Sequence, residues 1–567
     1  MSTQKEILEE ESWSGRALDR TRWTKKEFIV LLVCVTVASY LFSVNYNLNY
    51  MIINVPMYVF NSSSLAAIAP TIQNVLTIIL VPFYAKFSDV IGRAEIITIA
   101  LTLQVVGYIV QTTSNDFQQL TIGGLVASLG STGYSCLQSV IIADVIPLKN
   151  RAIFISGMDL CHLINIWVGQ AVIGYLATKE EWRLGMTLCT CFVAAGAVIL
   201  ISPLWYLQRK GEKALGERPR RTLGWLWKQF DFVGAIILTA TLSLIFFPLI
   251  TASTYKDNFK NPVILGCLCT GAVVLIVLLV WNARYTTKPM LPKRIWSDRT
   301  VMGAICGSVV SSLMVSMNYT YFYNYLVITR KIEFSRAFLL ARGYQMAYYV
   351  SALITGFLMR KFLTTRRFIW IGLIIQTIGT VVMIPARLPG TSDFFVAISQ
   401  AVVGLGDGIT SIAATVSITG SVHRRDYAMA IGVNLMMGSI IGAIGSAVAG
   451  SVWTQVLPKR LRYHIEGEYD ELRAMNNAEY ILALPEPTYS QVVAAYADSQ
   501  KILSIISASL VVIAGIFTLM MKKVDLSLSH DAQDTKFGGE ETTKEDMEER
   551  DGKVQSIDEE HTVDEKN

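Results

Sequence analysis

Long apolar stretches separated by short charged connections run along the chain almost to its end. About 20 consecutive apolar residues are enough for a helix to cross the hydrocarbon core of a bilayer, which is about 30 Å thick. Fourteen stretches reach this length or come close to it, at 28–50, 65–85, 96–113, 120–143, 153–177, 185–207, 230–251, 262–282, 300–326, 337–359, 368–386, 394–421, 427–457 and 502–521. We therefore predict an all-α membrane protein with fourteen transmembrane helices.

The fourteen stretches divide into groups of six, two and six. A long basic connection at 208–229 follows the sixth stretch, and the seventh and eighth stretches are almost uniformly apolar. Two six-helix halves are typical of transporters built from parallel repeats about an axis along the membrane normal. The predicted parts are a cytoplasmic segment at 1–27, a six-helix bundle at 28–207, a linker with two inserted helices at 208–299, a second bundle at 300–521 with a long outer loop at 458–501, and a disordered acidic cytoplasmic tail at 522–567.

Two short internal matches support the repeat. The first stretch ends in NYNLNY (45–50), and the ninth, its predicted counterpart, ends in NYTYFYNYL (318–326). The fourth stretch contains LGSTG (129–133), where the twelfth contains LGDGI (405–409). Both matches occur where a repeat of six helices would place them.

The distribution of charge sets the orientation of the chain. Only 16% of the 567 residues are charged and the mean hydropathy is +0.43, which is outside the range of ordinary soluble domains. Lys and Arg gather in alternate connections, and the positive-inside bias places these connections and both termini in the cytoplasm. Because the basic residues lie in separate loops, nucleic acid is not a predicted partner. A Gly-x-x-x-x-Gly-Lys-Ser/Thr sequence is absent, so we expect no nucleotide either.

Cysteines and possible metal ligands point to neither a disulfide framework nor a metal site. All eight cysteines fall within predicted helices, where small apolar fillers are the usual role of the thiol. His, Cys, Asp and Glu do not occur together at metal-ligand spacing, so we predict no bound metal and no cofactor. Asn61 begins the sequon Asn-Ser-Ser in a predicted outer connection and is the candidate glycosylation site.

The connection between the second and third stretches carries a recognisable charged motif. It runs from Ala85 to Arg93 and resembles the cytoplasmic signature of the major facilitator superfamily, although that family usually has Gly where Ala85 stands. We predict a gating latch in which Asp89 accepts from helix-terminal N–H groups and from a neighbouring Arg, Gly92 permits a tight backbone, and Arg93 crosses to an acidic partner when the cytoplasmic side is closed. A generic charged inner loop is the alternative, but it does not explain the Asp-x-x-Gly-Arg spacing.

Further segments narrow the resemblance to the fungal siderophore-iron transporter family. These are ADVIPLKNRA (143–152), NIWVG (165–169), FDFVGAIIL (230–238), KPMLP (288–292), DYAMAIGV (426–433), GAIGSAVAGSVWTQVLP (442–458) and ALPEPTYSQVVAAYADSQKIL (483–503). The first also fits fourteen-helix drug exporters, whereas the last two do not. The resemblance implies proton-driven import of ferric siderophores, mostly hydroxamates, by alternating access.

The resemblance leaves several functions open. Some members of the family handle haem or glutathione, and a proton-coupled exporter or exchanger of drugs or glutathione is an alternative, as is a receptor that binds without transporting. The predicted location is the plasma membrane, or a vacuolar or endosomal membrane. No nucleophile–base set or cofactor motif points to an enzyme.

Ionisable residues inside the predicted helices are candidates for proton coupling. A charged side chain at the centre of a helix costs about 2.5–3.5 kcal/mol on insertion scales, so each one calls for an explanation. Asp407 lies near the centre of the twelfth stretch and is predicted to load a proton outside and release it inside; a structural Asp bonded to a neighbouring helix is the alternative. Asp159 and His162, three residues apart in the fifth stretch, form a second pair that is either structural or proton-carrying.

Aromatic and amide side chains near the outer ends of the helices are candidates for substrate binding. Stripes of this kind can stack on a bulky, amide-rich chelate and hydrogen-bond to it, although an interfacial Tyr belt prefers the same depth. The candidates are Asn45, Tyr46 and Asn49 in the first stretch, Tyr319, Tyr323 and Asn324 in the ninth, and Arg342, Gln345 and Tyr349 in the tenth. Arg342 could instead pair with Asp407 or hold an acidic group of the ligand.

Overall fold

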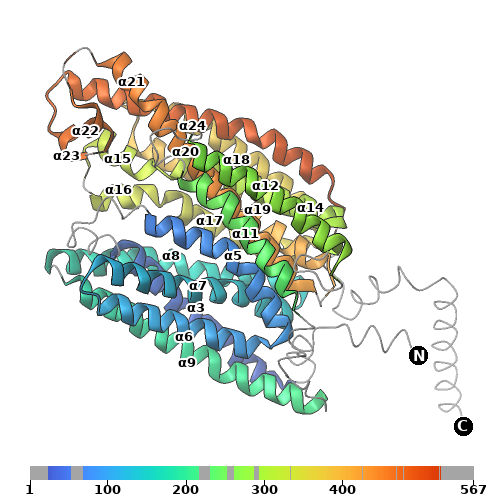
Figure 1. The fold of residues 1–567 in the computed structure, drawn as a ribbon. Coiled ribbons are helices and arrows are strands. Elements are labelled where there is room, and N and C mark those ends of the chain that lie inside the picture. The colour runs from blue at the N-terminus through green and yellow to red at the C-terminus, as the bar shows by residue number, and fades with distance from the viewer. Residues whose placement is uncertain are drawn as a thin grey trace, which may run out of the picture.

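The described part of the chain is built from helices and their connections. The computed structural model describes residues 23–52, 68–179, 181–215, 230–251, 261–286, 293–332, 334–423, 426–465, 467, 469–476, 478–522, 524 and 526. Most of these residues are helical, and no strand occurs among them (Figure 1). Asn61 and the acidic tail beyond 526 lie outside the described residues.

Six long helices form the first group along the chain. They are α3 (Lys25–Ile52), α5 (Ile68–Val90), α6 (Arg93–Thr112), α7 (Phe117–Val145), α8 (Leu148–Lys179) and α9 (Trp182–Leu215). Helix α3 packs against α8 and α9, α6 packs against α7 and α9, and α5 packs against α7. These helices lie together on one side of the molecule in Figure 1.

The second group contains both long and short helices. They are α13 (Lys293–Ser297), α14 (Arg299–Tyr319), α15 (Phe322–Arg330), α16 (Phe334–Ala341), α17 (Gly343–Phe362), α18 (Arg366–Ala386), α19 (Asp393–Gly420), α20 (Tyr427–Gln455), α21 (Leu457–His464), α22 (Glu471–Asn476), α23 (Ala478–Leu482) and α24 (Thr488–Leu519). Helix α19 packs against α14, α17 and α18, and α24 packs against α14 and α18.

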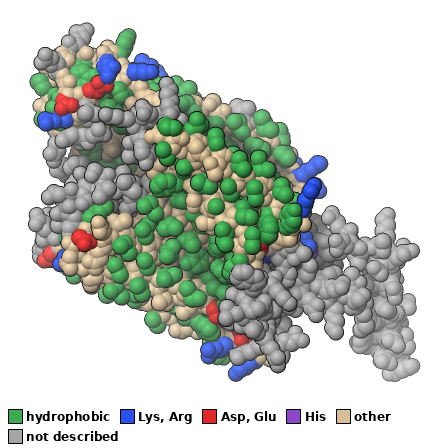
Figure 2. All heavy atoms as spheres, in the orientation of Figure 1, with side chains coloured by type: hydrophobic (Ala, Val, Ile, Leu, Met, Phe, Trp, Pro, Cys, Tyr) green, Lys and Arg blue, Asp and Glu red, His purple; other side chains and the backbone are tan. Residues whose placement is uncertain are grey.

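Two further helices lie between the groups along the chain. Helix α11 (Phe232–Thr251) packs against α5 and α20, which belong to different groups, and α12 (Pro262–Arg284) packs chiefly against α11. Much of α12 is exposed and apolar; Val263 and Ile276, for example, are 70% and 61% exposed. Figure 2 shows hydrophobic side chains across the middle of the molecule, with the charged side chains gathered toward its ends. An apolar band between charged ends is the surface expected of a protein in a bilayer.

The helices agree with the predicted stretches more closely in position than in number. Each of the fourteen predicted stretches falls on a helix or a pair of helices, but only twelve candidate spans among the described residues are long and apolar enough to cross a membrane. The second and tenth stretches, which lie on α5 and α17, are not among the twelve. Polar residues such as Lys86 in α5 and Arg360 in α17 lower the hydropathy of these helices. The number fourteen therefore stays a prediction.

The outer part of the second group differs in detail from the predicted pattern. The ninth stretch divides into α14 and α15 around Thr320 and Tyr321, and the tenth divides into α16 and α17 at Arg342. Residues 458–501, expected as a polar loop, contain helices and the first turns of α24. Tyr489 and Tyr496 in this region are buried, and Tyr496 lies edge-on to Trp453 with ring centroids 5.2 Å apart, whereas Tyr463 is exposed.

The packing of two glycines supports the internal repeat. On α7, a Cβ added at Gly130 would lie 2.4 Å from the backbone nitrogen of Gln104 on α6. On α19, a Cβ added at Gly406 would lie 2.3 Å from the backbone nitrogen of Gln376 on α18. Gly130 belongs to LGSTG and Gly406 to LGDGI, so the matched motifs make the same contact between adjacent helices.

Candidate functional site

Three glycines around Asp407 bring its neighbouring helices unusually close. Added Cβ atoms at Gly404 and Gly408 would lie 2.1 Å from the Tyr344 carbonyl oxygen and 2.4 Å from the Tyr348 carbonyl oxygen, so α17 lies directly against this face of α19. Gly406, on the other side of α19, makes the contact with α18 described above. The sequence GLGDG at 404–408 therefore leaves Asp407 in a narrow space between helices.

Asp407 points into the second helix group. Its side chain is buried, and its two carboxylate oxygens accept hydrogen bonds from the hydroxyl groups of Ser311 on α14 and Tyr344 on α17. The Ser311 hydroxyl is also 2.8 Å from the amide oxygen of Gln376 on α18. Hydrogen bonds to two other helices are compatible with both roles predicted for Asp407, the structural and the proton-carrying one.

Arg342 does not neutralise Asp407. Its guanidinium donates to the amide oxygen of Gln345, three residues further along, as expected for side chains on one helical face. No ion pair to Asp407 occurs within the described part of the chain. The suggested Arg342–Asp407 contact is thus replaced by two hydroxyl contacts.

A series of aromatic rings connects the two helix groups. The Tyr344 ring lies 4.8 Å from Tyr319 and 6.3 Å from Tyr348, measured between ring centroids. Tyr349 then lies 5.4 Å from Tyr348 and 5.8 Å from His162 on α8. His162 in turn lies 5.8 Å from Tyr46 on α3. We call this series the aromatic path; its members are Tyr319, Tyr344, Tyr348, Tyr349, His162 and Tyr46.

Three of the predicted substrate residues belong to this path, while the amides of the first helix do not all face it. Tyr46, Tyr319 and Tyr349 are members. Asn45 is only 3% exposed and donates to the Tyr108 hydroxyl on α6 at 3.0 Å, so its amide points into the first group. The Asn49 side-chain oxygen is buried without a hydrogen-bond partner in the described structure.

The remaining residues of the ninth stretch lie further out, on α15. Tyr323 packs against an aromatic cluster that includes Phe322 and Tyr325, whereas Asn324 is exposed. Helix α15 packs against α16, α23 and α24, and neither residue contacts Asp407 through a hydrogen bond in the described structure.

Asp159 and His162 are neighbours along α8 but do not pair. No hydrogen bond or ion pair joins them in the part of the chain that the structure describes, and the His162 Nδ1 atom is buried without a partner. Asp159 lies close enough to interact electrostatically with the hydroxyl groups of Tyr348 and Tyr349. His162 therefore packs within the aromatic path and is not paired with Asp159.

The predicted latch residues form a buried ion-pair cluster. Arg93 is fully buried, and its guanidinium lies 2.6 Å from a carboxylate oxygen of Asp89 and 3.1 Å from one of Asp144 on α7. It also donates to the Ser88 hydroxyl at 2.7 Å. These acidic partners are both in the first helix group, so in this conformation the cluster fastens α5, α6 and α7 to one another. Sequence reasoning did not name Asp144, although it stands second in the motif ADVIPLKNRA.

Gly92 meets a conformational requirement at this turn. Its φ of 138° lies in a region that residues with a side chain rarely adopt, and an added Cβ would lie 2.1 Å from a carboxylate oxygen of Glu95. The side-chain amide of Gln208 on α9 accepts from the Ala94 backbone N–H at 2.9 Å and donates to Glu95 at 2.7 Å. The turn is thereby tied to α9 as well.

The two helix groups meet closely at the end of the molecule that carries this cluster, which we call the latch end. An added Cβ at Gly432 on α20 would lie 2.9 Å from the Ala85 methyl group, which explains how Ala85 is tolerated where the superfamily usually has Gly. The Arg151 guanidinium on α8 stacks over the Tyr427 ring of α20 at 4.8 Å. The latch end is therefore closed in this structure.

Sequence reasoning missed several buried polar residues of the second group. Ser311, Tyr344 and Gln376 surround Asp407 but have no charge or spacing that would mark them. Arg387 is only 1% exposed, and its guanidinium lies 3.8 Å over the Phe322 ring. Arg387 directly follows an apolar stretch, so nothing in the sequence distinguishes it from an ordinary loop residue.

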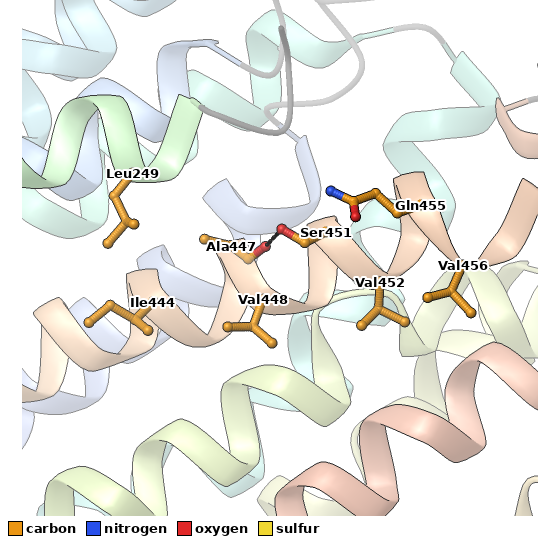
Figure 3. A pocket seen from close by; sticks show the side chains of 8 residues that line it. All are labelled: Leu249, Ile444, Ala447, Val448, Ser451, Val452, Gln455 and Val456. Carbon is orange, nitrogen blue, oxygen red and sulfur yellow. Dashed lines mark hydrogen bonds between the residues drawn. The ribbon is translucent and has the colours of Figure 1, made fainter. Parts of the chain in front are cut away.

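One apolar groove is separate from these polar residues. It lies along α20 beside Leu249 of α11, as Figure 3 shows, and has a cavity volume of about 250 Å³. Its lining is mostly aliphatic, and the Ser451 hydroxyl donates to the Ala447 carbonyl oxygen at 2.9 Å. The groove offers no charged side chain and does not suit a polar chelate.

The described residues contain no group of three or more His, Cys, Asp or Glu side chains that could hold a metal ion. The eight cysteines are free thiols.

Comparison with known proteins identifies the family. The model of the Major Facilitator Superfamily matches residues 28–446, which is most of the chain. The chain belongs to this superfamily. It is therefore a multi-pass membrane transporter and not an enzyme. The solved structure of the proton:xylose symporter XylE agrees with the fold at a TM-score of 0.52 and 10% identity, covering 90% of this chain and 99% of that chain.

Curated relatives confirm the narrower resemblance. Siderophore iron transporter mirC of Emericella nidulans is 26% identical over 79% of this chain and 76% of its own length. Low affinity heme transporter str3 of Schizosaccharomyces pombe is 24% identical over 86% of this chain and 81% of its own length. The chain thus resembles fungal siderophore iron transporters over most of its length.

Proposed function

We propose that this protein imports a ferric siderophore, most readily of the hydroxamate type, together with protons across the plasma membrane by alternating access. The relatives named as siderophore iron transporters support the substrate class. The observation that carries the coupling part is the buried Asp407 carboxyl, held by Ser311 and Tyr344 midway along α19. It adjoins the aromatic path, so a proton and a substrate would act on neighbouring side chains.

The aromatic path supports a bulky, weakly charged substrate. Its rings come from α3 and α8 in the first group and from α14 and α17 in the second, so a ligand bound along it would contact both groups. Aromatic faces combined with amides such as Asn49 and Gln345 suit a chelate whose surface is rich in amides. The iron would arrive inside the chelate as cargo.

Haem is the second candidate substrate. A flat macrocycle also stacks on tyrosine rings, and His162 lies between Tyr46 and Tyr349 with a buried Nδ1 atom that has no partner in the described structure. An imidazole nitrogen of this kind is a common axial ligand of haem iron. The relative named as a low affinity heme transporter gives this alternative its weight.

Uptake by iron-starved fungal cells that make no siderophores of their own tests the substrate. Cells expressing this chain would be supplied with one radioiron chelate at a time: a ferric hydroxamate, a ferric catecholate or haem. We expect iron accumulation and growth with the hydroxamate. Accumulation only with haem would favour the second candidate, whereas efflux of preloaded chelate without net uptake would indicate an exporter.

The close contact between Gly432 on α20 and Ala85 on α5 should be needed for closure of the latch end. Gly432→Val places two methyl groups against Ala85 and is expected to push α20 away from α5, which opens the latch end. Uptake should fall by tenfold or more, because the closed-latch conformation is required once in every transport cycle. Gly438→Val is the matched control, since an added Cβ there meets nothing within 4 Å.

Surface expression and uptake, measured together, would check this prediction. If Gly432→Val reached the membrane and transported at the rate of Gly438→Val, closure of the latch end by this contact would be wrong.

A further inference from the structure

We propose that Ser311 is a hydroxyl switch and that Gln376 is the acceptor that allows Asp407 to take up a proton. The inference rests on the proposed proton-coupled function and assigns positioning roles to two residues around the coupling carboxyl. Ser311 donates to Asp407 when the carboxylate is ionised and to Gln376 when the carboxyl is protonated.

The geometry gives Ser311 two acceptors for one hydrogen. Its hydroxyl oxygen is within hydrogen-bond distance of a carboxylate oxygen of Asp407 and lies 2.8 Å from the amide oxygen of Gln376. A serine hydroxyl has a single hydrogen to donate and two lone pairs to accept with, and its hydrogen rotates to suit its surroundings. Only one of the two contacts can therefore be a donation by Ser311 at any moment.

The two protonation states of Asp407 use this freedom differently. When the carboxylate is ionised, Ser311 and Tyr344 each donate to one of its oxygens. When a proton from the water phase binds to the oxygen facing Ser311, the new O–H group donates to the Ser311 oxygen, and the Ser311 hydrogen turns to Gln376. Tyr344 continues to donate to the other oxygen. The proton comes from a hydronium ion, whose O–H bond breaks as the carboxyl O–H bond forms and which leaves as water; the other changes are rotations of hydrogen bonds.

Gln376 provides the acceptor that Ser311 needs when Asp407 is protonated. A protonated carboxyl needs an acceptor, and Ser311 can serve as one without losing its own donation only because the Gln376 oxygen lies within reach. Gln376 is completely buried and its amide nitrogen has no partner in the described structure, so water does not replace it readily. With the carboxyl protonated, its O–H, the Ser311 hydroxyl and the Gln376 oxygen each have a partner, which favours this arrangement of hydrogens.

Among the described residues, no charged side chain forms an ion pair with Asp407. The side chains that hydrogen-bond to Asp407 are Ser311 on α14 and Tyr344 on α17, and Asp407 also interacts electrostatically with the hydroxyls of Tyr319 on α14 and Tyr348 on α17. Helix α18 contributes the neutral amide of Gln376. No described Lys, Arg or His hydrogen-bonds to Asp407, and Asp159 on α8 acts on Tyr348 rather than directly on the carboxyl.

The test is the pH dependence of uptake in proteoliposomes containing Gln376→Leu, Ser311→Ala or Ser311→Thr. Loss of one buried hydrogen bond should weaken proton binding about tenfold, so we expect Gln376→Leu to move the midpoint of uptake about one pH unit lower. Ser311→Ala should also shift the midpoint of the pH dependence of uptake. Ser311→Thr keeps a hydroxyl and should have the midpoint of the unmodified protein. Ser308→Ala is the matched control on α14, because that hydroxyl bonds to Asn434 and not to Asp407.

A measurement without transport separates the inference from the function on which it rests. The carbonyl stretch of protonated Asp407, followed by infrared difference spectroscopy of purified protein, should titrate at lower pH in Gln376→Leu. An unshifted titration in both Gln376→Leu and Ser311→Ala would overturn the switch even if Asp407 remained essential. If Asp407→Asn kept proton-driven accumulation, Asp407 would have only a structural role and the coupling part of the proposed function would be wrong.

Discussion

Replacing Asp407 by Asn is expected to abolish concentrative uptake while sparing binding and exchange of substrate across the membrane. The Asn amide has nearly the shape of the protonated carboxyl and can still accept from Tyr344, so the packing of α19 should survive. Unlike the carboxyl, however, the Asn amide cannot bind and release a proton. Exchange needs only the loaded protein to change conformation, whereas net accumulation needs release and rebinding of the proton.

The size of the effect follows from the driving force. A membrane potential of 100 mV contributes about 2.3 kcal/mol for each proton that accompanies a neutral chelate, which corresponds to a concentration ratio of about 50. Without a coupled proton the ratio of a neutral chelate should fall to about 1. Accumulation in vesicles with an imposed potential, compared with counterflow in vesicles preloaded with the chelate, measures both quantities.

Asp393→Asn is the matched control for this prediction. Asp393 lies on the same helix at its first turn, where its partly exposed carboxylate pairs with Arg330 at 3.6 Å and with the exposed Arg336 at 3.2 Å. The Asp393→Asn variant should keep concentrative uptake, because ion pairs that solvent reaches contribute little to the stability of a protein. Normal accumulation by Asp407→Asn would show that Asp407 has only a structural role, and loss of binding as well would show that the substitution damages the site.

The sequence was sufficient to predict the all-helical membrane fold, and the reason is physical. Each apolar stretch must bury its backbone polar groups in hydrogen bonds within the segment, so hydropathy alone identifies most helices. The same reasoning failed at residues 458–501, where a polar, tyrosine-rich sequence folds onto the outer aromatic cluster around Tyr325. There the decisive contacts are between residues far apart in the chain.

The candidate site could be predicted only in part. A lone carboxyl such as Asp407 stands out in an apolar stretch because it is costly to bury. Its partners Ser311 and Gln376 do not stand out, since a hydroxyl or an amide within a helix usually bonds to its own backbone or to a neighbour. Asn45 is the opposite case. Its place in a stripe of aromatic and amide residues makes it stand out in the sequence, but its amide donates to Tyr108 inside the first group.

The largest effect on stability is expected at the latch. Arg93→Gln removes the positive charge that lies between Asp89 and Asp144 and leaves both carboxylates in a buried space. Breaking a buried ion pair by removing one partner typically destabilises a protein by about 3–5 kcal/mol. The turn between α5 and α6 is also tied to α9 by the Gln208 side chain, so it has little freedom to expose these carboxylates to water.

Thermal unfolding of the purified protein in detergent, followed by tryptophan fluorescence, would measure the loss. The melting temperature of Arg93→Gln should be several degrees below that of Arg360→Gln, a matched control in which the arginine is exposed at the end of α17. Adding Asp144→Asn to Arg93→Gln should recover part of the stability, because it removes one of the two uncompensated charges. Equal melting temperatures for Arg93→Gln and Arg360→Gln would mean that the cluster does not hold α5, α6 and α7 together.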